Sequence, residues 1–255
     1  MATGCRKVVR LSSFTQLERR LAPHGLVPLA PVQRRRFSLV FPARQVETGR
    51  ALFVKLLLSQ APGVRRNFGR EIDILRELAG KPGVTPLVVS STDPRMVFHA
   101  CEIARGRSLL DIARSPEGRD LTCVLEHARS LARWITALHG MGIVHRDLSP
   151  DHVFIQRDGS PVVIDFGMAK RTRELSAEDR MRFEGYDLQA LGMMLWEMIC
   201  GHPVFRYRDP ALFVVLRREA TLVRGASLPA SVRRWLLDCL AVPSEFTPDQ
   251  RFFLR

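Results

Sequence analysis

The most constraining feature of the chain is a pair of short segments, GIVHRDLSPDHVFI at residues 142–155 and VVIDFGMAK at residues 162–170. In each segment an apolar, β-type run leads into a turn that carries an aspartate, Asp147 in the first and Asp165 in the second. A carboxylate held at the end of a buried strand can accept a proton or bind a hard cation. The two segments therefore predict a site that performs chemistry.

The spacing of apolar residues predicts an α+β fold. The early part reads as a strand at 37–41, the turn ETGR and a second strand at 51–57. In the later part apolar residues recur every three or four positions, which is typical of helices. The predicted helices cover 14–21, 64–79, 122–139, 186–199 and 231–240, and further strands are predicted at 85–90, 95–103, 153–155 and 162–164. Strands that dominate early and helices that dominate late favour two lobes.

The composition is that of an ordinary soluble protein. The 255 residues suffice for one large domain or two small ones, and 46% are hydrophobic and 25% charged. Five widely spaced cysteines exclude a Cys-x-x-Cys pair and fit a reducing compartment. The N-terminus lacks the apolar run of a signal peptide, and no stretch of about 18 apolar residues exists to span a membrane. We therefore expect a cytoplasmic protein.

Positive charge is concentrated in the N-terminal part of the chain. Of the net charge of +13, +12 lies in residues 1–70, which hold 14 Lys and Arg residues and only two acids, Glu18 and Glu47. This basic field either is merely solvated or favours an anionic partner, such as an acidic membrane surface at the inner membrane face. No specific nucleic acid is expected, because no aromatic residues are interleaved with the arginines for base stacking.

The segments that carry Asp147 and Asp165 resemble the catalytic and metal-binding loops of the protein-kinase superfamily. LFVK resembles the strand that carries the phosphate-binding lysine, REIDILREL its glutamate helix, and CEIARGRSLL the hinge. YDLQALGMMLWEMICGHPVF resembles the helix that anchors the larger lobe, and the whole match covers Ala51 to Phe205. The resemblance implies a two-lobed protein-kinase-like fold: a basic N-terminal extension at 1–36, a β-rich N-lobe at 37–102 and a mainly helical C-lobe at 103–255.

The resemblance also implies roles for single residues. Asp147 would orient the acceptor hydroxyl and take its proton, and Asp165 would bind Mg²⁺ on the phosphates of ATP. Lys55 would bind these phosphates in a pair with Glu71. Glu71 flanks the apolar face of its predicted helix, where a carboxylate needs a partner.

Further residues receive a place from the same resemblance. Glu102 and Ala104 of the hinge would contact the nucleotide. His145 would pack in a column with Phe166 and Leu75, and Asp187 would bind backbone amides of the catalytic loop. Arg146 would pair with a phosphorylated activation segment, for which Thr172 and Ser176 are the nearby candidates.

Four departures set the chain apart from ordinary protein kinases. No glycine lies between Gly25 and Gly49, so phosphate contacts there must come from other backbone amides or from arginines 34–36. Phe53 stands two residues before the lysine, where a small residue usually covers the adenine. The second metal ligand is His152 instead of asparagine, which suits Mn²⁺ better than Mg²⁺, although His152 is also compatible with a structural role. Only 19 residues separate Gly167 from Asp187, so the activation segment is abbreviated.

These departures leave three hypotheses open. The first is a divergent, bacterial-type Ser/Thr protein kinase, which the intact Lys55, Glu71, Asp147 and Asp165 favour. The second is a glycolipid or small-molecule kinase, because Phe53, His152 and the short activation segment resemble the lipopolysaccharide-core sugar kinases. The third is a pseudokinase that acts as a binding module. The acceptor would be a protein in the first case and a glycolipid in the second.

Overall fold

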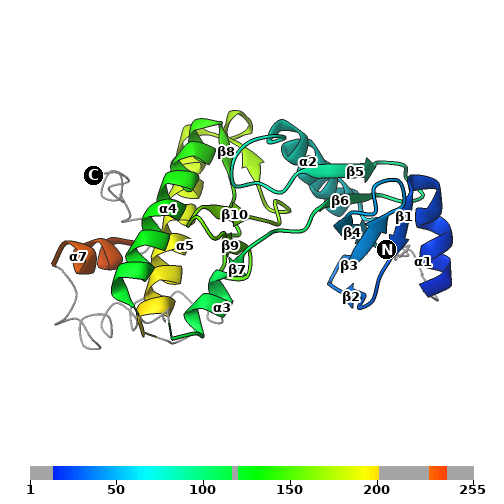
Figure 1. Ribbon diagram of the computed structural model, residues 1–255. Helices are drawn as coiled ribbons and strands as arrows, with labels where there is room; N and C mark the ends of the chain where they lie inside the picture. Colours follow the sequence, from blue (N-terminus) through cyan, green and yellow to red (C-terminus); the bar gives the residue numbers. More distant parts are fainter. Residues whose placement is uncertain (1–13, 117–119, 201–229, 240–255) are drawn as a thin grey trace. The chain divides into compact units, whose positions relative to one another are not determined.

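The computed structural model describes residues 14–116, 120–200 and 230–239 (Figure 1). The chain divides into two compact units, the first ending at Ala104 and the second beginning at Arg105. The first unit is built on a sheet and the second is mainly helical, so the α+β fold predicted from the sequence is confirmed. Within the described ranges, no helix is long and apolar enough to cross a membrane.

The first unit contains an antiparallel sheet in the order β1-β3-β4-β6-β5. Strand β2 pairs with residues near the start of β3. Its strands are β1 Leu26–Pro28, β2 Gln33–Arg34, β3 Ser38–Gln45, β4 Ala51–Leu57, β5 Leu87–Ser91 and β6 Phe98–Glu102. The predicted strands at 37–41 and 51–57 are confirmed as β3 and β4, joined by the predicted turn. The sheet also includes β1 and β2, which lie within the basic segment 1–36.

Each face of this sheet packs against one helix. Residues of β4 alternate in burial, so Leu52, Val54 and Leu56 form one core with Leu17 and Leu21 of α1 (Phe14–Leu21). The short 3-10 helix η1 (Ala22–His24) follows α1. On the other face α2 (Pro62–Glu77) forms a smaller core, which consists of Leu57, Phe68, Ile72 and Val97. Phe53 and Lys55 of β4 point to the face opposite to Leu52, Val54 and Leu56 and are less buried than these three residues.

The second unit combines helices with short strands that frame its loops. The helices are α3 Leu109–Ala113, α4 Leu121–Gly140, α5 Ala177–Cys200, α7 Ala230–Cys239 and the 3-10 helix η3 Thr172–Glu174. The strands are β7 Arg107–Ser108, β8 Ile143–Val144, β9 Val153–Ile155, β10 Pro161–Val163 and β11 Lys170–Arg171. Strands β10, β9 and β7 form one sheet, and β11 pairs with β8. The segments that carry Asp147 and Asp165 therefore lie in loops anchored at both ends by strands.

The predicted start of the helix at 186–199 was wrong. Helix α5 begins at Ala177, nine residues before the predicted start at residue 186. Ser176 accepts a hydrogen bond from the amide of Asp179 and so caps the helix, and Arg180 pairs with Glu184 one turn later. The first turns are stabilised by polar contacts rather than by an apolar stripe, which is why the apolar pattern missed them.

Candidate active site

Lys55 and Glu71 form an ion pair inside the first unit, as the sequence predicted. The Nζ atom of Lys55 lies 2.8 Å from Oε1 and 3.0 Å from Oε2 of Glu71. The Glu71 side chain is 2% exposed and that of Lys55 is 17% exposed. A buried carboxylate needs a partner of opposite charge, and Lys55 supplies it from β4 while keeping partial access to solvent.

His99 is a third member of this cluster, and sequence reasoning missed it. Its Nε2 atom lies 3.3 Å from Oε1 of Glu71, and its Nδ1 atom lies 3.7 Å from Sγ of Cys101. The ring also packs against Phe68 of α2 at a centroid distance of 5.3 Å. The signal that could have found it is the strand register, because His99 stands directly opposite Lys55 on the neighbouring strand.

The segment expected to act as a hinge begins with the last two residues of β6 and continues beyond it. Glu102 is half-buried, its amide donates to the carbonyl of Pro86, and its carboxylate lies 3.2 Å from Arg50. Ala104, which is also half-buried, ends the first unit. Phe53 stands opposite Cys101 in the register and exposes 42% of its surface on the face that carries Lys55.

An arginine-rich turn lies between β2 and β3, in the segment whose lack of glycines the sequence showed. Gln33 and Arg34 pair with β3, and Arg35 donates its amide to the carbonyl of Ser38. The guanidinium of Arg36 lies 4.8 Å from the ring centroid of Phe37. Arginines 34, 35 and 36 are all exposed, so the turn presents cationic side chains rather than a bare backbone.

Asp187 organises the loop that carries Asp147. The Oδ2 atom of Asp187 accepts from the amide of His145 at 2.8 Å, and Oδ1 accepts from the amide of Arg146 at 2.6 Å. His139 of α4 lies 2.9 Å from Oδ2 through its Nε2 atom. The prediction that Asp187 binds amides of this loop is confirmed, while the contact of His139 was not foreseen.

Two residues of these loops have a strained backbone. Among the residues that the structure describes, the non-glycine residues with positive φ are Arg146 at 69° and Asp165 at 62°. This left-handed conformation is unfavourable for residues with a Cβ atom and tends to occur at functional sites. One strained residue directly precedes Asp147, and the other is the candidate metal ligand itself, whose Oδ1 accepts from the amide of Gly167 at 3.2 Å.

His145 is a buried part of the scaffold. Its ring contacts Phe166 at a centroid distance of 4.9 Å and Trp134 at 6.5 Å, so the predicted contact with Phe166 is confirmed. Burial lowers the pKa of His145, and its Nδ1 atom accepts from the amide of Asp147 at 3.4 Å. Leu75, the third residue of the predicted column, belongs to the first unit, and its place in that column stays a prediction.

His152 lies between the backbone of Asp147 and the carboxylate of Asp165. Its Nδ1 atom lies 2.9 Å from the backbone oxygen of Asp147, and its Nε2 atom lies 3.9 Å from Oδ2 of Asp165. Donation from Nδ1–H to a backbone carbonyl leaves the Nε2 lone pair directed at Asp165, an orientation common among metal-bound histidines. No cluster of three His, Cys, Asp or Glu in the described part of the chain could hold a metal by itself. Asp165 and His152 therefore suit a metal that is held largely by phosphates and water.

Arg146 is engaged within its own unit. Its guanidinium donates to the carbonyl of Met168 at 3.2 Å and lies 4.2 Å from the ring centroid of Phe183. The candidate modification sites are in the same region: Thr172 bonds its amide to the carbonyl of Gly142, and Ser176 caps α5. Phe183 was not singled out from the sequence, since nothing marks it before α5 is placed.

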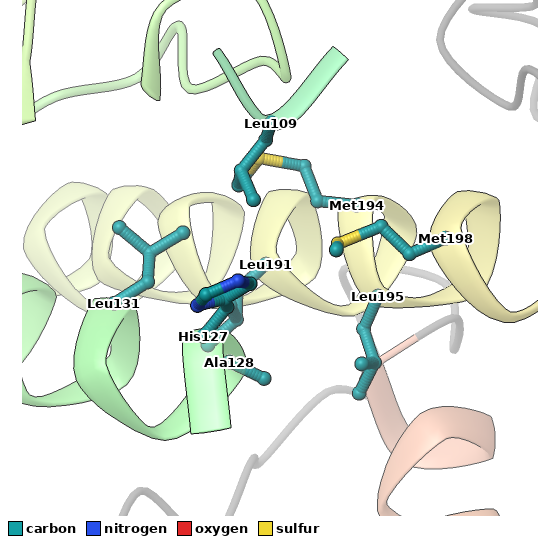
Figure 2. A pocket seen from close by; sticks show the side chains of 8 residues that line it. All are labelled: Leu109, His127, Ala128, Leu131, Leu191, Met194, Leu195 and Met198. Atoms are coloured by element: carbon teal, nitrogen blue, oxygen red, sulfur yellow. The ribbon is translucent and has the colours of Figure 1, made fainter. Parts of the chain in front are cut away.

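A separate pocket in the second unit carries no catalytic groups. Figure 2 shows that it is lined by apolar side chains and one histidine: Leu109, His127, Ala128, Leu131, Leu191, Met194, Leu195 and Met198. His127 lies 3.3 Å from Sγ of Cys123, and burial lowers its pKa. Its mainly apolar lining does not suit a phosphate, so the candidate groups remain those of the two loops in the second unit and, within the first unit, the Lys55 cluster.

Comparison with known proteins identifies relatives across most of the chain. The protein kinase domain family matches residues 35–226. The chain is 28% identical over 203 residues to CBL-interacting protein kinase 16 of Oryza sativa subsp. japonica, which covers 69% of this chain and 43% of that protein. It is 28% identical over 193 residues to 3-phosphoinositide-dependent protein kinase 1 of Homo sapiens, which covers 67% of this chain and 34% of the relative.

A bacterial relative matches a longer part of the chain. The chain is 30% identical over 237 residues to the serine/threonine-protein kinase AfsK of Streptomyces coelicolor, which covers 83% of this chain and 29% of AfsK. The chain thus spans less than half the length of each of these relatives.

Proposed function

The chain belongs to the protein kinase domain family, and from this premise we propose that it transfers the γ-phosphate of ATP to Ser or Thr hydroxyls of a protein. Members of this family use ATP with Mg²⁺ as a rule. The observation that carries the proposal is the strained backbone of Arg146 and Asp165. Strain of this kind tends to occur at functional sites, and it supports the view that the loops are shaped to place the carboxylates of Asp147 and Asp165.

The proposed roles follow from the position of each side chain. Lys55, held by Glu71, binds phosphate oxygens of the nucleotide through its partly exposed ammonium group. Asp165 and His152 hold the metal, which when bound neutralises phosphate charge. Asp147 accepts the proton of the acceptor hydroxyl while the hydroxyl oxygen bonds to the γ-phosphorus and the bond from phosphorus to the leaving ADP breaks.

The adenine would contact the segment after β6. Because the Glu102 amide already donates to Pro86, we assign the backbone carbonyl of Glu102 and the amide of Ala104 to the base. The ring of Phe53 is exposed on the same face as Lys55 and would contact the base directly. A glycolipid acceptor is the second candidate, favoured by Phe53 and by the short activation segment. In that case the basic N-terminal residues would bring the protein to the anionic inner face of a membrane.

The test is a transfer assay with radiolabelled ATP, first with Mg²⁺ and then with Mn²⁺. The acceptors are the protein itself, a mixture of generic proteins and a bacterial lipid extract. We expect label on Ser or Thr of a protein, which Asp147→Asn abolishes while nucleotide binding persists, because Asp147 acts on the acceptor. Asp158→Asn is the matched control, since Asp158 lies in the turn between β9 and β10 and only caps Ser160.

The other outcomes discriminate between the alternatives. Label in the lipid extract alone would replace the protein acceptor by a glycolipid. Nucleotide binding in a thermal-shift titration without any transfer would identify a binding module. If neither metal supports a nucleotide-dependent shift, the phosphotransfer proposal is wrong. Loss of nucleotide binding in Asp147→Asn would show that Asp147 is structural.

A further inference from the structure

Glu71 contacts two basic groups, although one would neutralise it. Lys55 bonds both of its carboxylate oxygens, and Nε2 of His99 lies 3.3 Å from Oε1. The Nε2 atom is buried and has no well-aligned hydrogen bond, so its interaction with Glu71 is one of charge at close range. One basic group suffices to neutralise a carboxylate, so the second basic group at Glu71, His99, needs an explanation.

The register makes this arrangement unusual. Lys55 on β4 and His99 on β6 are directly opposite each other, and such residues point to the same face with their Cβ atoms about 5 Å apart. Like charges at directly opposed positions destabilise a sheet. The pairing is tolerated here because Glu71 of α2 lies within contact distance of both groups.

The two basic groups differ in their access to solvent. His99 is 7% exposed and its ring is covered by Phe68, whereas Lys55 keeps partial exposure. Burial acts to lower the pKa of His99, but the charge of Glu71 and the contacts with Glu71 and Cys101 outweigh it and raise this pKa to about 9. At neutral pH the cluster therefore contains two positive charges and one negative charge.

We propose that His99 is a positioning residue that acts as a buried counter-ion of Glu71 and so adds positive charge beside Lys55, the proposed ligand of an anionic nucleotide phosphate. This inference rests on the proposed role of Lys55 in nucleotide binding. A Lys55–Glu71 pair alone is neutral and attracts a phosphate only weakly. A protonated His99 adds one positive charge next to this pair, which compensates for backbone amides that a glycine-rich loop would supply.

Several groups from the described part of the first unit lie against His99. They are Glu71 and the Phe68 ring from α2, Lys55 from β4, the thiol of Cys101 on its own strand, and Ser90 at the opposed position on β5. Of these, the thiol of Cys101 is a second group that can titrate in the alkaline range, so the experiment includes a variant without it.

The experiment measures the affinity for ATP with Mg²⁺ by calorimetry between pH 7.5 and 9.5. We expect the dissociation constant of the unmodified protein to rise about tenfold as pH passes through about 9. His99→Gln keeps a polar side chain of similar length without the charge. This variant should bind ATP about tenfold more weakly at pH 7.5, and its affinity should not fall further as pH rises through 9. His24→Gln is the matched control, because His24 packs on Phe98 at the opposite face of the sheet.

A nucleotide-free measurement separates this inference from the proposed function. The ring protons of His99 should titrate near pH 9 by NMR in the unmodified protein and below 6.5 in Glu71→Gln, because burial then acts without the opposing charge of Glu71. If ATP does not bind but the NMR result holds, the proposed function fails while the pairing of His99 with Glu71 stands. If the loss of ATP affinity at alkaline pH vanishes in Cys101→Ala, this loss belongs to the thiol and the inference is overturned. Unchanged ATP affinity in His99→Gln overturns it as well.

Discussion

His99 in the first unit and His145 in the second are both buried histidines near a buried carboxylate, yet their pKa values shift in opposite directions. Burial lowers the pKa of His145, whereas for His99 the charge of Glu71 and the contacts around the ring outweigh burial and raise it to about 9. The difference lies in what the carboxylate touches. Glu71 lies 3.3 Å from the ring of His99, while Asp187 bonds the backbone amides of His145 and Arg146.

The comparison shows that one residue type can serve two purposes. The ring of His145 accepts from a backbone amide and packs against Phe166, and both contacts suit a neutral imidazole. The ring of His99 has a carboxylate at one nitrogen, which suits an imidazolium. Proximity to an acid is thus insufficient to charge a histidine. The acid must face the ring itself, because desolvation otherwise dominates.

The largest expected effect concerns the two carboxylates. Asp187→Ala leaves the amides of His145 and Arg146 without their acceptor inside the second unit, so we expect the free energy of unfolding to fall by about 3–5 kcal/mol. Glu71→Gln should cost less, about 2–3 kcal/mol at neutral pH, because it removes the counter-ion of His99 while Lys55 can still be hydrated at its exposed side. Urea denaturation of both variants measures the difference, and equal losses would contradict the distinction between the units.

The next effect is the alkaline dependence of stability in the first unit. Because the pKa of His99 is raised from 6.5 to about 9, its contribution is fully present below pH 6.5 and is lost as pH rises through about 9. The stability of the unmodified protein relative to His99→Gln should therefore shrink by a few kcal/mol over this range. Denaturation midpoints of both proteins at several pH values test this, and a constant difference would mean that His99 does not bind a proton on folding.

The opposite dependence is expected from His145. Because its pKa is lowered by burial, its contribution is present above the unfolded pKa and is lost as pH falls. The slope cannot exceed about 1.4 kcal/mol per pH unit for one proton. His145→Phe fills a similar volume against Phe166 and cannot titrate, so it should flatten the acidic limb of the stability profile. An acidic limb that persists in this variant would assign the effect to other groups.

The smallest effect concerns a third histidine, His152. Its Nε2 atom faces Asp165, so His152→Asn should shift the ratio of rates with Mg²⁺ and Mn²⁺ several-fold toward Mg²⁺. Stability should change little, since the asparagine amide can still donate to the carbonyl of Asp147. Initial rates with each metal measure this ratio. A large loss of stability with an unchanged ratio would make His152 a brace of the loop only.

Part of the candidate site was predictable from the sequence. The position of Glu71 beside an apolar helix face predicted that it needs a partner, and the resemblance to protein kinases implied that Lys55 is this partner. The roles given to Asp147 and Asp165 stay predictions, although the structure places both in strand-anchored loops. His99 and His139 were missed, because their partners lie 28 and 48 residues away along the chain.

By itself the sequence determined the α+β order of elements, the kinase family and the strand and helix that carry Lys55 and Glu71. These properties follow from apolar periodicity and short motifs, and both are patterns among residues that lie close together in the sequence. Only the tertiary structure decided that the pKa of His99 is raised and that of His145 lowered, and which carboxylate each histidine lies near. Such contacts depend on strand register and helix docking, which bring distant residues within 3–4 Å, and pKa values respond to distances on this scale.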